Sequence, residues 1–107
     1  MGLAVRSGVR SRPTISWRFW RRPTISRFFG IKIQMYWRDH PPPHFHAFYG
    51  DDEATFAIDD GRLLAGDFSP RARRLIEEWR QQYASELADA WRRASREQDP
   101  GVIEPLR

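Results

Sequence analysis

The stretch IKIQMYWR, residues 31–38, alternates apolar and polar side chains without interruption. Successive side chains of a β-strand point to opposite faces, so this period of two predicts a strand with one buried face and one polar face. The face expected to be buried consists of Ile31, Ile33, Met35 and Trp37. The opposite face consists of Lys32, Gln34, Tyr36 and Arg38.

Further strands are expected after this one. Residues 44–49 have strand character, and their alternation adds His44 and His46 to the polar face. Residues 53–58 alternate again, and Gly50-Asp51-Asp52 before them is a turn signal. Asp59-Asp60-Gly61 carries the Asp-Gly hairpin signal, which predicts a short fourth strand over residues 62–65.

The second half of the chain is expected to be helical. Ser69-Pro70 is a helix start, because serine caps the first turn and proline is tolerated at the first helical position. Apolar residues then recur at helical spacing as far as Ala94. A straight helix over residues 70–96 would be about 40 Å long, about twice the length of so small a sheet. We therefore expect a break at residues 83–85.

Together these elements predict an α+β domain. It has a small antiparallel sheet of three to four strands, followed by two helices or one broken helix packed on one face. The buried strand face, with Phe56 and Ile58, should pack against helical side chains: Leu75, Ile76, Trp79 and Trp91. The tail should dock through Ile103 and Leu106.

Composition excludes several classes of protein. The 107 residues include no cysteine, which excludes disulfide frameworks, thiol nucleophiles and cysteine-ligated zinc. No stretch approaches the roughly 18 apolar residues that a membrane span needs. We expect a cytoplasmic protein without membrane association.

The positive charge of the chain comes from its N-terminal end. Residues 1–27 hold seven arginines and no acid, whereas residues 28–107 hold the other 11 basic residues against all 14 acids. Arg12-Pro13-Thr14-Ile15-Ser16 recurs as Arg22-Pro23-Thr24-Ile25-Ser26. We expect residues 1–21 to be a basic, poorly ordered extension of a single domain at residues 22–107, although an arm that binds nucleic acid or an acidic partner has the same composition.

All three histidines lie in the segment His40-Pro41-Pro42-Pro43-His44-Phe45-His46. Three interpretations compete: metal ligation with Asp39, general acid–base catalysis with Arg38 stabilising a phosphoryl charge, and a structural or partner-docking hairpin. An extended polyproline segment would hold His40 about 12 Å from His44. For this reason the sequence predicts no metal and no cofactor.

The chain also resembles a known family. Pro23-Thr24-Ile25-Ser26-Arg27-Phe28-Phe29-Gly30-Ile31 and the segment from Asp39 to His46 are similar to domain-of-unknown-function family 4160, over about residues 22–107. Members begin with Met where this chain has Arg22, and often carry a carboxylate where it has Phe48. The resemblance implies a small bacterial protein encoded beside another small protein, as in toxin–antitoxin pairs.

Two functions are therefore expected. The first is a binding or regulatory component of a toxin–antitoxin-like gene pair, whose partner is a small protein encoded by a neighbouring gene or a nucleic acid. Its binding residues would be Tyr36, Arg38, Asp39 and Glu53. The alternative is a small nuclease-like toxin that acts on RNA. Its catalytic candidates are His40, His44, His46 and Arg38.

A truncated chain that begins at Arg22 tests the expected extension. Because an exposed tail buries little surface, its Tm in thermal denaturation should stay within about 2 °C of that of the full chain. A markedly lower Tm would mean that residues 1–21 pack against the domain.

Overall fold

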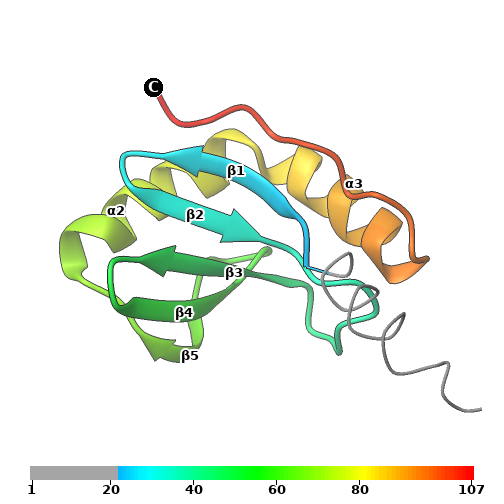
Figure 1. The fold of residues 1–107 in the computed structure, drawn as a ribbon, viewed down its shortest axis with the longest axis horizontal. Helices are drawn as coiled ribbons and strands as arrows, with labels where there is room; N and C mark the ends of the chain where they lie inside the picture. The colour runs from blue at the N-terminus through cyan, green and yellow to red at the C-terminus, as the bar shows by residue number, and fades with distance from the viewer. Residues whose placement is uncertain (1–21) are drawn as a thin grey trace, which may run out of the picture.

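In the computed structural model, which describes residues 22–107, a five-stranded sheet carries two helices on one face (Figure 1). All neighbouring strands are antiparallel and follow chain order: β1 (Thr24–Phe28), β2 (Ile31–Gln34), β3 (His44–Tyr49), β4 (Asp52–Ala57) and β5 (Leu63–Asp67). The helices are α2 (Pro70–Gln82) and α3 (Ala84–Ser95). This confirms the predicted α+β class and the two helices. The predicted disorder of residues 1–21 lies outside the described residues.

The prediction of three to four strands was wrong, because it missed β1. The register between β1 and β2 shifts between Thr24 and Ser26, so Ile25 and Ser26 are both buried. A bulge of this kind removes the period of two by which a strand is recognised in sequence. The connecting residues Phe29 and Gly30 have φ angles of 48° and 82°, the backbone of a tight hairpin without an Asn-Gly or Asp-Gly signal.

The last strand also differs from its predicted range of residues 62–65. It begins at Leu63 and continues to Asp67, past Gly66. Gly66 has a φ angle of 84°, and its Cα lies against the backbone of Glu53 and Ala54 on β4. A residue without a side chain allows the two strands to approach this closely, so pairing continues to Asp67.

The two helices begin and end where the sequence predicts. Ser69 caps α2, since its side chain accepts a hydrogen bond from the backbone N–H of Ala72 at 3.3 Å, and Pro70 is the first helical residue. Tyr83 separates α2 from α3 with φ −118° and ψ 32°. The break allows both short helices to cover one sheet rather than a single helix overshooting it.

The core lies between the sheet and the helices. The predicted face is buried at Ile31, Ile33, Met35, Phe56 and Ile58, and it packs on Ile76 and Trp79. Trp37, Leu75 and Trp91 are only partly buried at the edge of this core, where the prediction had placed them inside it. No helix within residues 22–107 is long and apolar enough to cross a membrane.

The C-terminal tail docks on the domain through Ile103 and Leu106, as expected, and it lies along β1 (Figure 1). Ile103 and Leu106 are buried, and the Ile103 N–H donates to the Ile25 carbonyl at 2.7 Å. The indole N–H of Trp79 donates to the Glu104 carbonyl at 2.9 Å. The tail therefore holds the edge strand and the central tryptophan at the same time.

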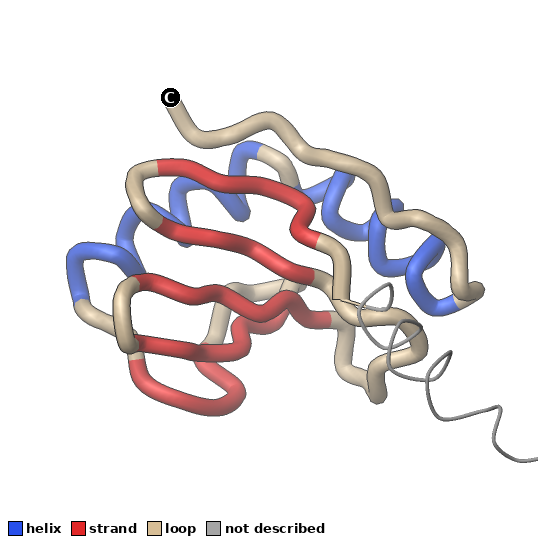
Figure 2. The backbone as a smooth tube through the Cα atoms, in the orientation of Figure 1, coloured by secondary structure: helices blue, strands red, loops and turns tan. Residues whose placement is uncertain are grey.

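One connection within the sheet is much longer than the others (Figure 2). Residues 29–30, 50–51 and 58–62 form short turns, whereas residues 35–43 form a loop between β2 and β3. The Arg38 N–H donates to the Ala94 carbonyl at 3.2 Å, and the Ile58 N–H donates to the Pro43 carbonyl at 3.0 Å. The loop is thus fastened to α3 and to the end of β4.

Substitution of two glycines tests the close approach of β4 and β5. Gly66→Ala and Gly50→Ala both place a side chain at positive φ, which costs about 1–2 kcal/mol. A Cβ at Gly66 would in addition lie 2.2 Å from the Glu53 carbonyl oxygen, whereas one at Gly50 meets nothing within 4 Å. Denaturant unfolding should show the larger loss of stability for Gly66→Ala; equal losses would contradict the contact.

Candidate functional site

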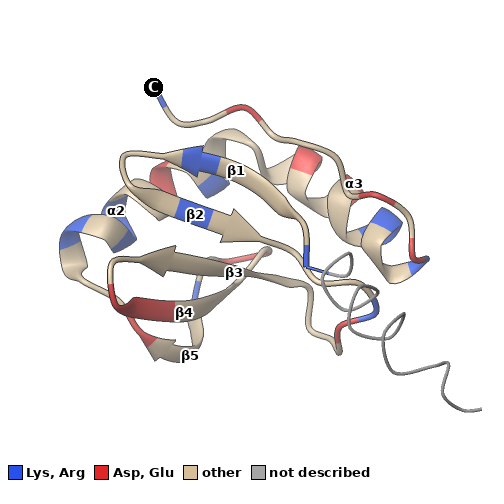
Figure 3. Ribbon diagram, viewed as in Figure 1, with Lys and Arg blue, Asp and Glu red and all other residues tan. Residues whose placement is uncertain are grey.

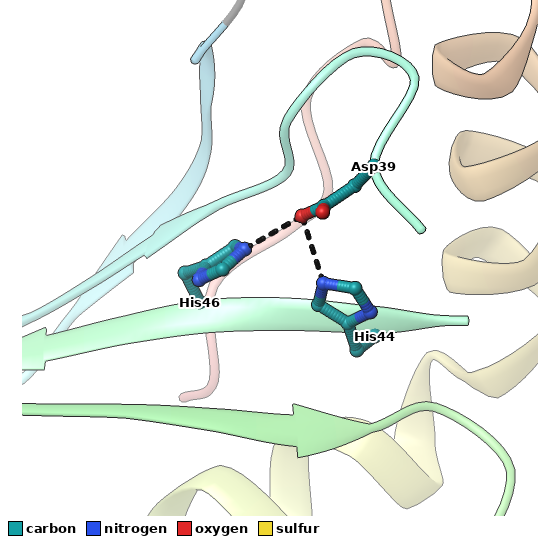
Figure 4. A group of neighbouring side chains, drawn as sticks. All are labelled: Asp39, His44 and His46. Atoms are coloured by element: carbon teal, nitrogen blue, oxygen red, sulfur yellow. Dashed lines mark hydrogen bonds and ion pairs between the residues drawn. The ribbon is translucent and has the colours of Figure 1, made fainter. Parts of the chain in front are cut away.

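A carboxylate oxygen of Asp39 lies between two histidine rings (Figure 4). Its Oδ2 is 2.8 Å from Nε2 of His44 and 2.9 Å from Nε2 of His46. His44 and His46 are two residues apart on β3, so their rings project from the same face of the strand. Asp39 reaches them from the loop of residues 35–43. We refer to Asp39, His44 and His46 as the His–Asp cluster.

The loop bends, contrary to the extended polyproline segment that the sequence indicated. The Pro41–Pro42 peptide bond is cis, and the rings of His40 and His44 are 5.5 Å apart. Bending brings Asp39 over β3, but it leaves the His40 ring at the exposed edge of the cluster, with Nε2 3.8 Å from Oδ1 of Asp39. The His40 side chain is 84% exposed, and its Nδ1 lies 3.2 Å from the Pro41 carbonyl.

Each member of the His–Asp cluster is held from outside by a second group. Nδ1 of His44 lies 2.6 Å from the Pro42 carbonyl, to which it donates. Nδ1 of His46 lies 3.3 Å from the hydroxyl of Thr55, its cross-strand neighbour on β4. Oδ1 of Asp39 accepts from the backbone N–H of His40 at 2.9 Å. These contacts orient both rings so that Nε2 points to the carboxylate.

Aromatic rings form the walls of the cluster. The ring of Tyr36 stacks on His46 with a centroid separation of 3.8 Å and an interplanar angle of 12°. The ring of Trp91 on α3 lies 5.1 Å from that of His44. The side chains of His46 and Asp39 are each 15% exposed, and that of His44 is 3% exposed. The cluster is therefore reached by solvent from the His46 and Asp39 side.

The surroundings shift the proton affinities of three groups. Burial alone would raise the pKa of Asp39, but hydrogen bonds from His46 and His44 outweigh it, so its pKa lies below the ordinary value. Burial lowers the pKa of His46, against the opposing effect of the Asp39 hydrogen bond. Burial raises the pKa of Tyr36, although the nearby Arg22 guanidinium opposes this shift. Near neutral pH Asp39 is thus an anion and His46 is neutral.

The predicted site residues divide into two groups. Asp39, His44, His46 and Tyr36 come together. Arg38 does not join them, since its guanidinium pairs with Glu97 at 2.8 Å and both side chains are exposed. Among the predicted binding residues, Glu53 lies on β4 near enough for its charge to raise the pKa values of Tyr36 and His46.

The sequence analysis did not predict three groups that contact the His–Asp cluster. Thr55 alternates onto the polar face of its strand, a signal that could have placed it beside a histidine. The carbonyl of Pro42 and the ring of Trp91 gave no such signal, because a backbone oxygen has no residue type and Trp91 fits helical core spacing equally well.

A charged row crosses the sheet on the face opposite the helices. Strand pairing aligns five residues across it, which we call the open sheet face: Arg27, Lys32, Phe48, Glu53 and Asp67. The cations come from β1 and β2 and the carboxylates from β4 and β5 (Figure 3). Within residues 22–107 no helix covers this face (Figure 1). His46 and Thr55 belong to the next row, so the His–Asp cluster borders it.

The His–Asp cluster has the composition of a metal site. One ligand atom from each of its residues lies within 4.8 Å of the other two. Two imidazoles and one carboxylate are a frequent ligand set for divalent transition metals. A carboxylate–histidine pair also serves as an acid–base unit when no metal is bound.

Comparison with known proteins places the chain in a family. A family model described as "Domain of unknown function (DUF4160)" matches residues 30–92. The chain belongs to DUF4160. No curated protein and no solved structure matches it. The part that matches DUF4160 contains the whole His–Asp cluster with Thr55 and Trp91, whereas β1 and Glu97 lie outside it.

Two alanine substitutions test which histidines belong to the cluster. His44→Ala removes a buried ring together with its contacts to Asp39 and the Pro42 carbonyl, which should cost about 2–4 kcal/mol. His40→Ala removes an exposed side chain and should leave Tm within about 2 °C. Circular dichroism melts of the two variants give the comparison. Equal losses would mean that the loop does not hold His40 outside.

Proposed function

We propose that the chain is a binding or regulatory component of a toxin–antitoxin-like gene pair. Its open sheet face docks a small partner protein encoded by the neighbouring gene. The resemblance to the family implies the pair of neighbouring genes. The geometry of the sheet suggests which surface of the chain binds the partner. The segregated charge of the open sheet face carries this proposal.

The row of charges suits a folded protein with the opposite arrangement. Arg27 and Lys32 occupy one end of the row, Glu53 and Asp67 the other, and Phe48 lies between them. A partner with a carboxylate patch beside a basic patch, separated by an apolar centre, would match all three parts. Complementary charges of this kind fix the orientation of docking and accelerate association.

A nucleic acid matches the same surface less well. Its phosphates are uniformly negative, so Glu53 and Asp67 would repel them while only one end of the row attracts them. The net charge of residues 28–107 also disfavours nucleic acid, because these residues hold 14 acids against 11 Lys and Arg. Binding of nucleic acid in place of a protein is thus an outcome that the experiment below would detect.

A second candidate is a small nuclease that acts on RNA through the His–Asp cluster. The observation that favours it is the neutral, partly exposed His46 held by Asp39, which is the arrangement of a general base. Support from the other proposed residues is weaker. Arg38 pairs with Glu97, and the buried His44 has both ring nitrogens occupied by protein contacts.

Charge reversal tests the docking function. The chain is co-expressed with the product of its neighbouring gene, and the affinity of the purified pair is measured. Lys32→Glu and Glu53→Lys should each weaken binding about tenfold or more, because each places like charges against each other. Arg71→Glu is the control, an exposed charge reversal on α2. Failure to co-purify, or equal weakening by all three variants, would contradict the proposal.

Growth assays separate docking from the nuclease. Expression of the chain alone and with its neighbour is scored for growth arrest. Arrest by the chain alone, relieved by His46→Ala but unaffected by Lys32→Glu, would replace the docking proposal by the nuclease.

A further inference from the structure

We propose that the His–Asp cluster is a mononuclear binding site for a divalent transition-metal ion, with zinc as the representative ion. Asp39, His44 and His46 supply one ligand atom each. The inference goes beyond the docking function and does not depend on it, since the two use different groups of side chains.

The first support is the arrangement of ring nitrogens around the carboxylate. Nε2 of His44 lies 2.8 Å and Nε2 of His46 lies 2.9 Å from the same oxygen, Oδ2 of Asp39. The Pro42 carbonyl can only accept, so Nδ1 of His44, 2.6 Å away, donates to it, and Nε2 is the ring atom that meets Asp39. One carboxylate oxygen and two imidazole nitrogens therefore face one another within 4.8 Å.

The second support is the set of outer contacts. Metal-ligating histidines almost always donate their other ring N–H to a carbonyl, carboxylate or similar acceptor, which fixes the tautomer and the ring orientation. His44 has the Pro42 carbonyl in this position, and His46 has the Thr55 hydroxyl. Asp39 is held by the His40 N–H through its other oxygen. All three ligands are therefore oriented before an ion arrives.

The third support is the fit of distances. Zinc binds nitrogen and oxygen at about 2.0–2.1 Å, so tetrahedral ligand atoms lie about 3.3 Å apart. The Asp39 oxygen is 2.8 Å and 2.9 Å from the two ring nitrogens. Admission of an ion thus requires the Asp39 oxygen to withdraw from each nitrogen by a few tenths of an ångström, and the two ring nitrogens, which lie within 4.8 Å of each other, to stand about 3.3 Å apart. Asp39 belongs to a loop, which can supply such a movement.

The ligand types select the class of ion. Two imidazole nitrogens favour zinc and its transition-metal neighbours over calcium and magnesium, which prefer oxygen ligands. Three protein ligands also leave one tetrahedral position free. Because the side chains of Asp39 and His46 are each 15% exposed, that position would face solvent and accept a water molecule or an anion.

Metal binding is measured on full-length protein without a His-tag, after removal of metal with a chelator. Zinc titration by calorimetry should show one ion per chain with a Kd of about 1 μM or tighter. His46→Ala should weaken zinc binding at least 100-fold. Thr55→Val keeps the ligands and the side-chain shape but loses the outer hydroxyl, and should weaken binding about 10-fold.

His40→Ala is the matched control, because it also removes one histidine, but an exposed one that supplies no ligand atom to the cluster, and should leave the zinc affinity nearly unchanged. Circular dichroism of each metal-free variant confirms that it is folded before titration. Cobalt, used as a spectroscopic substitute, should give the visible absorption bands of a four-coordinate ion. Absence of stoichiometric zinc binding, or equal weakening by His40→Ala and His46→Ala, would overturn the site. Neither result would bear on the charge-reversal experiment on the open sheet face.

Discussion

The buried indole of Trp79 is the contact on which the rest of the domain depends. It has no exposed surface, and its ring lies 5.3 Å from Phe28 on β1 and 5.6 Å from Phe45 on β3. Its N–H donates to the Glu104 carbonyl in the tail. One side chain from α2 therefore joins an edge strand, the centre of the sheet and the C-terminus. With this side of the sheet covered by the helices, the opposite face is left open within the described residues.

The core and the site meet on a single strand. β3 alternates Phe45 and Ala47 toward the helices with His44 and His46 toward the other side. Packing of Phe45 against Trp79 consequently holds the strand from which both imidazoles project. Such a site lies on a rigid element rather than on a loop, and only Asp39 arrives from a more adaptable segment.

The open sheet face and the His–Asp cluster are neighbours on the same side of the sheet. Lys32, Phe48 and Glu53 form a row of cross-strand partners, and His46 with Thr55 begins the next row. A protein docked on the first row would approach the exposed edge of the cluster.

The local sequence was sufficient to predict an element wherever that element has a regular spacing of apolar residues or a characteristic residue at its end. The alternation over residues 31–38 predicted the buried face of the sheet, although the strand itself ends at Gln34 and residues 35–38 belong to the loop. The cap at Ser69-Pro70 and the break at residues 83–85 predicted both helices, since these features follow from backbone geometry. Alternation also placed His44 and His46 on one face.

Tertiary structure decided the remaining features of the fold and the site. β1 is recognised as a strand only through its partners, because a bulge removes its period. Asp39 enters the site, and Arg38 and His40 leave it, because the loop bends back over β3 and Glu97 lies where it can pair with Arg38. Such contacts join residues far apart in the chain, and no local pattern encodes which of several nearby polar side chains will meet.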